Sequence, residues 1–259
     1  MDLGLKGKRA LIVGASKNIG AAVARCFAAE ECAVTVVARD QERLAKLVDE
    51  LGGTAAGHGF VCSDLLEHGE PTRVAVHIRE TIGHCEIVVH NVGGALGCKD
   101  PFGRIEDWER VWRFNVGVAI EMNRVLIPAM LERGWGRVVH VSSISAQDGE
   151  PLLVPYGGAI PYAAAKAYLN AYVKALGREC AKGNVIVSAL MPGAILSEGK
   201  YWDTVRQEQP ALVNDFVSRH YAIGRFGRPE EIAPFAVFMA SEQASFAAGA
   251  IVPIDGGRM

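Results

Sequence analysis

Short apolar runs alternate with longer segments of helical spacing along the whole chain, and this alternation restricts the fold more than any other feature. An apolar run without polar alternation is typical of a strand covered on both faces, as in a parallel sheet. Seven such strands alternating with helices predict an α/β fold, a doubly wound sheet of seven mostly parallel strands flanked by helices. The expected strands are 9–14, 33–38, 57–62, 86–90, 137–142, 185–190 and 250–254, and the expected helices are 19–30, 41–51, 70–82, 106–132, 161–182 and 229–241.

The chain is expected to form a single domain over residues 1–259. No low-complexity linker and no repeat of fixed period interrupts the alternation, and either would mark a boundary. One connection, between Pro192 and Arg228, has only weak helical periodicity and is far longer than the usual few residues. We therefore expect a lid at about 194–222.

Charge and composition argue against several classes of protein. The 27 Lys and Arg residues nearly balance 29 Asp and Glu residues, without a polybasic block, so neither nucleic acid nor an anionic membrane is an expected partner. The longest uncharged stretches, such as 151–165 and 183–197, are shorter than the ~18 residues of a spanning helix. The N-terminus shows no basic-then-apolar leader, which favours a cytoplasmic protein.

The cysteines and histidines give no sign of a metal site. The six cysteines form no Cys-x-x-Cys, and the seven histidines have neither the spacing nor the cysteine neighbours of a zinc site. We expect reduced thiols and no metal.

The segment Gly14-Ala-Ser-Lys-Asn-Ile-Gly20 connects the first expected strand to the first expected helix. A chain that turns here exposes backbone N–H groups at a helix N-terminus, a geometry that attracts phosphate. The alternative is a turn that uses glycine only for its positive φ. Because the motif lies inside a complete strand-helix-strand unit, the dinucleotide interpretation is favoured.

The end of the second expected strand bears on the choice of cofactor. An enzyme that uses NAD normally places an acid here for the ribose hydroxyls, whereas this chain has Ala38 and Arg39. The planar, permanently charged guanidinium of Arg39 suits a 2′-phosphate, and Lys17 could add a second charge. NADP(H) is favoured over NAD(H). The alternative is that Arg39 caps the sheet edge and Asp40 is only a helix N-cap.

Tyr162 and Lys166 are four positions apart at the start of an alanine-rich helix, so both side chains lie on one face. A cation beside a phenol favours the phenolate and should lower the tyrosine pKa from about 10 toward neutral. Such a pair can exchange protons with a substrate. Alone, the spacing also fits a surface pair on an amphipathic helix.

Taken in order, these segments resemble the short-chain dehydrogenase/reductase family, in its form of about 250 residues, from the first strand to the last. The glycine loop is similar to the family's Gly-x-x-x-Gly-x-Gly, and His90-Asn91-Val92-Gly93 is similar to Asn-Asn-Ala-Gly. Asp64-Leu65 resembles the family's adenine-contacting Asp, and Asn115 matches its relay asparagine. Val141-Ser-Ser143 stands at the end of the fifth strand, where the family's catalytic serine lies. Pro192-Gly193 with Ser197 resembles Pro-Gly-x-x-x-Thr, and Gly224 to Ala233 with Asp255-Gly-Gly257 resembles the C-terminal signature.

The resemblance implies a Rossmann-type oxidoreductase that transfers a hydride between a nicotinamide and a carbonyl or secondary alcohol. Tyr162 is the implied acid and base, Ser143 holds the substrate oxygen, Lys166 holds the ribose and lowers the Tyr162 pKa, and Asn115 anchors a relay water. The expected cofactor-binding residues are Gly14, Ser16, Lys17, Asn18, Ile19, Gly20, Arg39, Asp64, Leu65, Asn91, Gly93, Tyr162, Lys166, Pro192, Gly193, Ile195 and Ser197. The family also implies a homotetramer, with a homodimer as the alternative.

The chain departs from the family at several positions. Asn18, Val13 and His90 replace a glycine, a threonine and an asparagine, and asparagine is the non-glycine residue that best adopts positive φ. Tyr162 follows Ser143 by 19 positions, where about 13 is common in the family. Tyr156 has the shorter spacing, but Ile160 stands where its lysine should be, so we assign Tyr162 and interpret 152–160 as an insertion.

Two alternatives to this function remain. One is a 3-oxoacyl-type reductase within the same family, and the other is a non-catalytic dinucleotide-binding protein. Specificity could come from the polar and aromatic lid residues Glu198, Lys200, Tyr201, Trp202 and Arg206, but solvated lid charges are the favoured explanation. Gln147, Asp148 and Glu150 could face the pocket or water, and we assign neither set.

Overall fold

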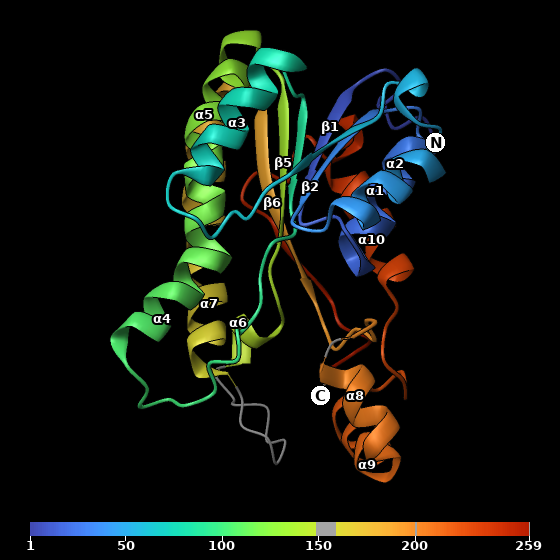
Figure 1. The fold of residues 1–259 in the computed structure, drawn as a ribbon, viewed down its shortest axis with the longest axis vertical. Coiled ribbons are helices and arrows are strands. Elements are labelled where there is room, and N and C mark those ends of the chain that lie inside the picture. The colour runs from blue at the N-terminus through green and yellow to red at the C-terminus, as the bar shows by residue number, and fades with distance from the viewer. Residues whose placement is uncertain (149–158, 200, 259) are drawn as a thin grey trace.

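A seven-stranded parallel sheet forms the centre of the molecule (Figure 1). The computed structural model describes residues 1–148, 159–199 and 201–258. The strands are β1 (Arg9–Val13), β2 (Ala33–Ala38), β3 (Gly59–Cys62), β4 (Ile87–His90), β5 (Gly136–Val141), β6 (Val185–Pro192) and β7 (Ile251–Ile254), in the order β3-β2-β1-β4-β5-β6-β7. Each of these neighbouring pairs is parallel. The predicted doubly wound fold is confirmed.

Two helical layers cover the sheet (Figure 1). One layer contains α1 (Asn18–Ala29), α2 (Gln41–Glu50) and α10 (Pro229–Met239), and the other contains α3 (Glu70–Thr81), α5 (Val118–Arg133) and α7 (Ile160–Cys180). Side chains alternate along each strand between the two faces, so Ile12 packs under the first layer whereas Leu11 and Val13 pack under the second. Because both faces are covered, most strand residues are apolar.

The long helix expected at 106–132 is interrupted. The structure has α4 (Ile105–Trp112), a π-helical turn over Arg113–Gly117, and then α5. Such a turn accommodates an extra residue and is frequent at functional sites. The stretch Ile105–Arg133 is long and apolar enough to cross a membrane, but 56% of its most apolar window is buried inside the protein, as in the core helix of a globular domain.

The segment expected to form a lid is mostly helical and lies apart from the two layers, at the lower right of Figure 1. It contains α8 (Tyr201–Glu208) and α9 (Pro210–His220). These helices pack on each other around a small core of their own, in which the Trp202 ring stacks on Phe216 at 4.5 Å between centroids. Lys200 lies outside the described residues, as do Tyr156 and Glu150 and most of the expected insertion.

The strand order reverses between β1 and β4. In sheets of this kind ligands bind in the crevice at the carboxyl ends of the strands beside that reversal. The glycine loop after β1, the loop after β4 and the serines after β5 all emerge there. The fold therefore brings to one edge the segments that the sequence analysis selected.

Candidate active site

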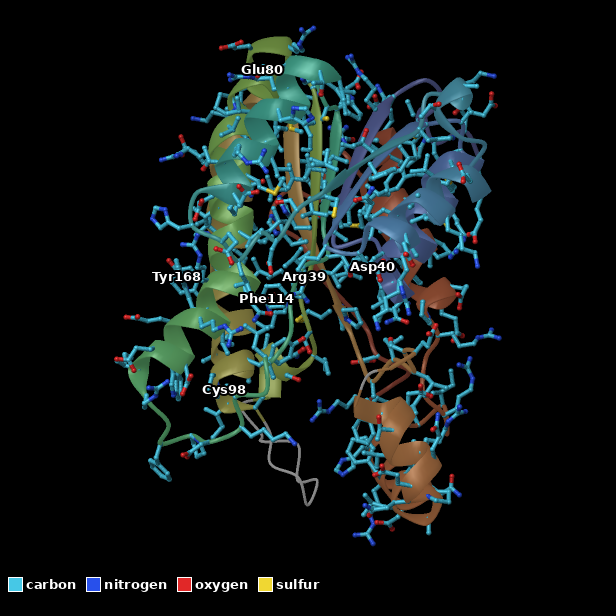
Figure 2. All side chains as sticks on the ribbon, in the orientation of Figure 1. Arg39, Asp40, Glu80, Cys98, Phe114 and Tyr168 are labelled. Carbon is cyan, nitrogen blue, oxygen red and sulfur yellow. The ribbon has the colours of Figure 1, made fainter. Side chains whose placement is uncertain are left out.

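A cavity of about 950 Å³ opens at this edge, near the upper end of the ~300–1,000 Å³ typical of ligand sites. Its wall includes these predicted residues: Gly14, Ser16, Lys17, Asn18, Ile19, Arg39, Asp64, Leu65, Asn91, Gly93, Ser143, Tyr162, Lys166, Pro192, Gly193, Ile195 and Ser197. Arg39, from the connection between β2 and α2, and Phe114, from the π-helical turn, both line it, and both are labelled in Figure 2. Gly20 and Asn115 are not part of the wall.

The glycine loop turns so tightly that residues larger than glycine do not fit at its two glycine positions. Gly14 has φ 86°, and a Cβ there would lie 3.0 Å from backbone atoms of Asn91 and Val92. A Cβ on Gly20 would collide with the carbonyl oxygen of Gly14, which accepts a 2.8 Å hydrogen bond from Asn91 Nδ2. Asn18 has φ 54°, so the expected positive φ at this departure from the family is confirmed.

Helix α1 begins directly at this loop. Its N-cap residue, Lys17, makes no side-chain capping bond, so the first N–H groups of the helix lack a capping side chain and suit a phosphate. Together with the cradle that a Cβ would fill, this arrangement fits the pyrophosphate of a dinucleotide.

The part of the cavity next to the end of β2 carries paired charges. Arg39 Nη1 lies 3.4 Å from Asp64 Oδ2. Asp40 caps α2 by accepting a 3.1 Å bond from the Arg43 backbone N–H, so its predicted N-cap role is confirmed. Arg39 and Asp40 nevertheless both line the cavity, and so does Arg43, which the sequence analysis missed. Arg43 lies in the first turn of α2, three positions after the N-cap Asp40, and a second arginine so soon after Arg39 is the signal that could have found it.

The carboxyl end of β5 and the first turns of α7 bring Ser143, Tyr162 and Lys166 together. Lys166 is 2% exposed, and its Nζ donates a 2.8 Å hydrogen bond to the carbonyl oxygen of Val141. The same nitrogen lies 5.7 Å from the centre of the Tyr162 ring. Ser143 Oγ lies 3.2 Å from the hydroxyl of Ser145, a cavity residue that the sequence analysis did not select.

The expected lowering of the Tyr162 pKa is wrong. Burial raises the pKa of Tyr162, and a hydrogen bond from Ser143 opposes that rise only in part. Burial also lowers the pKa of Lys166 to about 7. Both shifts have one cause, since a low-dielectric environment disfavours the charged form of each group. At neutral pH the phenol is therefore protonated.

Asn115 connects the π-helical turn to the loop after β4. Its Nδ2 donates to the carbonyl oxygens of Gly94 at 2.9 Å and Val111 at 2.8 Å, and its Oδ1 accepts from Gly94 N at 3.0 Å. A Cβ on Gly93 would lie 2.7 Å from Asn115 Oδ1 and 2.8 Å from Lys166 Nζ. Asn115 and Lys166 thus lie against the same glycine. Gly93 is part of the cavity wall, and Asn115 lies behind it.

A layer of buried polar side chains lies below this site. His90 and His140, paired in register on β4 and β5, stack with ring centroids 4.8 Å apart. His90 Nε2 is 2.8 Å from Asn123 Oδ1, and Asn123 Nδ2 donates to the hydroxyl of Tyr172 at 3.1 Å. Burial lowers the pKa of His90 to about 4 and that of His140 well below 6.5. Both imidazoles are therefore neutral at pH 7.

The loop after β6 forms the other wall of the cavity. Gly193 N donates to Ile254 O at 3.0 Å, and a Cβ on Gly193 would lie 2.9 Å from Asp255 Cα. Ile195 bridges Gly227, and Ser197 is buried. The residues of this loop that line the cavity, Gly193, Ile195 and Ser197, are the ones that would hold a nicotinamide ring, which supplies the hydride when the cofactor is bound.

Several other residues considered in the sequence have less direct positions. Trp202 lines the cavity from the lid, together with Tyr221 and Arg258, which the sequence analysis did not select. Arg206 pairs with Asp203 at 3.7 Å, and Gln147 is exposed on α6 (Ser145–Asp148). Over the described ranges, no group of three or more His, Cys, Asp or Glu side chains is arranged to hold a metal ion.

Comparison with known proteins gives matches over nearly the whole chain. A family model described as enoyl-(acyl carrier protein) reductase matches residues 14–258. The 3-oxoacyl-[acyl-carrier-protein] reductase FabG of Thermotoga maritima is 29% identical over 255 residues, covering 98% of each chain. The 2-dehydro-3-deoxy-L-rhamnonate dehydrogenase (NAD(+)) of a Sphingomonas strain is 30% identical over 254 residues, 97% of this chain and 95% of that one.

A solved structure is also similar to this chain over nearly its whole length. L-Sorbose reductase from Gluconobacter frateurii, complexed with NADPH and L-sorbose, superposes with a TM-score of 0.89 at 30% identity, covering 99% of this chain and 98% of that one.

Proposed function

The chain belongs to the short-chain dehydrogenase/reductase family, and on that premise we propose that it interconverts a ketone and a secondary alcohol with NADP(H), using Tyr162 as acid and base. As an oxidoreductase it acts on CH–OH and C=O groups, as its named relatives do. The observation that carries the proposal is that Tyr162 and Lys166 open onto the same cavity as the glycine loop.

The protonation states described above suit reduction. Burial keeps the phenol of Tyr162 protonated, so it can donate its proton to the carbonyl oxygen, while Ser143 supplies a second hydrogen bond to that oxygen. The nicotinamide cofactor supplies the hydride. Lys166, whose Nζ is 5.7 Å from the ring centre, stabilises the phenolate that remains. In the oxidative direction the same tyrosine accepts the proton of the alcohol.

Proton supply to Tyr162 is proposed to pass Lys166 and a water held beside Asn115. Support comes from Gly93, whose absent side chain leaves Asn115 Oδ1 and Lys166 Nζ facing one position. Asn115 also ties the π-helical turn to the loop after β4 through Gly94. Its role here is therefore both positioning and relay.

Two cationic side chains in the cavity support the proposed preference for NADP(H). Lys17 and Arg39 line the cavity at the end that we assign to the adenosine of the cofactor, and β2 ends in Ala38 instead of an acid. Arginine is suited to phosphate because its planar fork donates two parallel hydrogen bonds. NADPH is also the cofactor named for the L-sorbose reductase complex, whereas the Sphingomonas relative is named for NAD(+).

A 3-oxoacyl-type reductase is the second candidate. The family model and the Thermotoga relative favour it, while the sugar-directed relatives favour a small hydroxylated substrate. Nicotinamide absorbance during incubation with a short 3-oxoacyl thioester and with a panel of keto sugars and keto acids distinguishes the two. Oxidation of NADPH by no ketone, and reduction of NADP⁺ by no alcohol, would contradict the proposed activity altogether.

We also propose a cytoplasmic homotetramer. Helix α10 exposes Phe235 and Phe238, and Phe246 nearby is fully exposed, an apolar surface that a second subunit could cover. All six cysteines are free thiols, as suits a reducing compartment. Light scattering at micromolar concentration should give the mass of four chains, and a monomer would contradict the assembly.

A further inference from the structure

The start of the lid contacts the phosphate end of the cavity. Glu198 directly follows Ser197, and its backbone carbonyl oxygen accepts hydrogen bonds from Lys17 Nζ at 3.3 Å and Asn18 Nδ2 at 3.4 Å. Its carboxylate Oε1 lies 3.7 Å from Arg43 Nη2. One lid residue therefore spans the glycine loop and α2.

Arg43 lies between two carboxylates. Its Nε is 3.2 Å from Asp40 Oδ2 on one side, and its Nη2 faces Glu198 on the other. Asp40 is fixed, because its other oxygen caps α2. Glu198 is not fixed in this way, since its side chain is 75% exposed and can turn into water. Of the two partners of Arg43, Glu198 is the one that another anion can displace.

A phosphate monoester is a stronger partner for Arg43 than a carboxylate is. Near pH 7 it carries about −1.5 to −2 charges and three acceptor oxygens. Arg39, in the connection between β2 and α2, and Arg43, in the first turn of α2, line the same cavity, so a phosphate bound by the first is within reach of the second. Glu198 would repel that phosphate if it remained in place.

We propose that Arg43 is a specificity-determining residue that binds the 2′-phosphate of NADP(H), and that Glu198 competes with that phosphate for it. The lid carboxylate thereby limits how strongly the chain prefers NADP(H), because an NAD(H) molecule leaves the Arg43–Glu198 pair undisturbed. This inference rests on the proposed use of NADP(H) and adds two residues to it.

The test is calorimetric binding of two fragments that differ only in the 2′-phosphate, adenosine 2′,5′-bisphosphate and adenosine 5′-monophosphate. Arg43→Gln should weaken the bisphosphate about tenfold, the effect expected of a charged hydrogen bond. Glu198→Gln keeps the backbone carbonyl that holds Lys17 and should strengthen the bisphosphate about two- to fivefold, the range for an exposed pair. Neither substitution should change monophosphate binding more than about twofold.

The double variant Arg43→Gln/Glu198→Gln isolates the competition. If Glu198 acts through Arg43, Glu198→Gln has no effect once Arg43 is absent. Matched controls are Lys46→Gln and Glu42→Gln, which make the same charge changes on α2 at exposed positions outside the cavity wall. They should leave the affinity for both fragments unchanged, apart from a small field effect that added salt removes.

The outcomes separate this inference from the proposed function. Equal affinity of the unsubstituted protein for the two fragments would contradict the use of NADP(H) itself. A clear preference for the bisphosphate that Arg43→Gln leaves intact would overturn the role of Arg43 alone. The proposed competition is wrong if Arg43→Gln weakens bisphosphate binding but Glu198→Gln does not strengthen it. It is also wrong if Glu198→Gln still strengthens bisphosphate binding when Arg43 has been replaced.

Discussion

Lys166 Nζ lies 5.7 Å from the centre of the Tyr162 ring and donates a 2.8 Å hydrogen bond to the carbonyl oxygen of Val141. The hydrogen bond to Val141 holds the Lys166 ammonium at the end of β5, beside the cavity and near the face of the Tyr162 ring. The position is unfavourable for a charge, because burial lowers the pKa of Lys166 to about 7. A buried cation that reduces stability is expected where the cation serves the chemistry.

Replacing this lysine should therefore stabilise the fold while abolishing activity. Between pH 7 and 10.5 the unfolded chain binds the Lys166 proton more tightly than the folded chain does, so this group makes stability rise with pH across that window. Its charge lowers stability by about 5 kcal/mol at pH 7 and below. Loss of the bond to Val141 offsets about 1–3 kcal/mol of the gain. Lys166→Met should raise the free energy of unfolding by about 2–4 kcal/mol at pH 7.

Urea unfolding at pH 7 and near pH 10 measures this difference. The gain of Lys166→Met over the unsubstituted protein should shrink at the higher pH, where the native lysine is neutral. Exposed Lys174→Met on the same helix is the control and should show no such trend. A Lys166 variant less stable than the parent at pH 7 would contradict the burial argument.

The two stacked histidines predict sensitivity to acid. His90 has a pKa of about 4 in the fold and about 6.5 when unfolded. Below pH 6.5 the unfolded chain binds more protons, so stability is lost as the pH falls toward 4, by about 3 kcal/mol for His90 alone. His140 adds to the loss because its pKa is lowered in the same direction. The free energy of unfolding should decline over this range.

His90→Asn should flatten this decline, because the amide does not titrate. Chemical unfolding at pH 7.5 and 4.5 gives the slope, and His77→Asn on α3, outside the buried pair, is the control. Identical slopes for His90→Asn and the parent protein would show that the buried pair does not control acid stability.

Arg39→Asp should reverse the choice of cofactor. The substitution removes a phosphate ligand and introduces a carboxylate that repels the 2′-phosphate and can accept bonds from ribose hydroxyls. The KM for NADPH should rise at least tenfold while the KM for NADH changes little or falls. Steady-state rates with both cofactors measure this, and equal effects on the two would contradict the phosphate pocket.

The sequence was sufficient for the sheet and for most of the cavity wall. Strand residues such as Ile12 and Leu11 are apolar because helices cover both faces, and that pattern is visible without coordinates. Asn18 could be assigned positive φ because few other residues adopt it. The loops with Gly14, Asn91 and Ser143 follow parallel strands, so their meeting at one edge follows from topology.

Features that depend on packing could not be predicted. Helices α8 and α9 bury their apolar side chains mainly against each other, which leaves a weak periodicity in the sequence. The π-helical turn at Arg113–Gly117 changes the register of a helix without changing its composition. The predicted direction of the Tyr162 pKa shift is wrong because burial raises the pKa more than the hydrogen bond of Ser143 lowers it, and burial is known only from the fold.

Ser143→Ala should reduce turnover without affecting cofactor binding. Its hydroxyl bonds to Tyr162 and Ser145 and is proposed to hold the substrate oxygen, so its loss should lower kcat about 10²-fold, as for one oxyanion donor. Ser145→Ala, which keeps the Ser143 hydroxyl, is the matched comparison and should lower kcat much less. Equal losses in the two variants would remove Ser143 from its assigned role.

The central claim is that Tyr162 exchanges the proton during hydride transfer, and the rate of NADPH oxidation by Tyr162→Phe in the presence of a ketone tests it most directly. The variant should lose about 10²–10⁴-fold in kcat while it binds NADPH within about twofold of the parent protein, as measured by nicotinamide fluorescence. Tyr168→Phe, half-exposed on the same helix, should retain full turnover. A Tyr162→Phe variant with undiminished turnover would contradict the account.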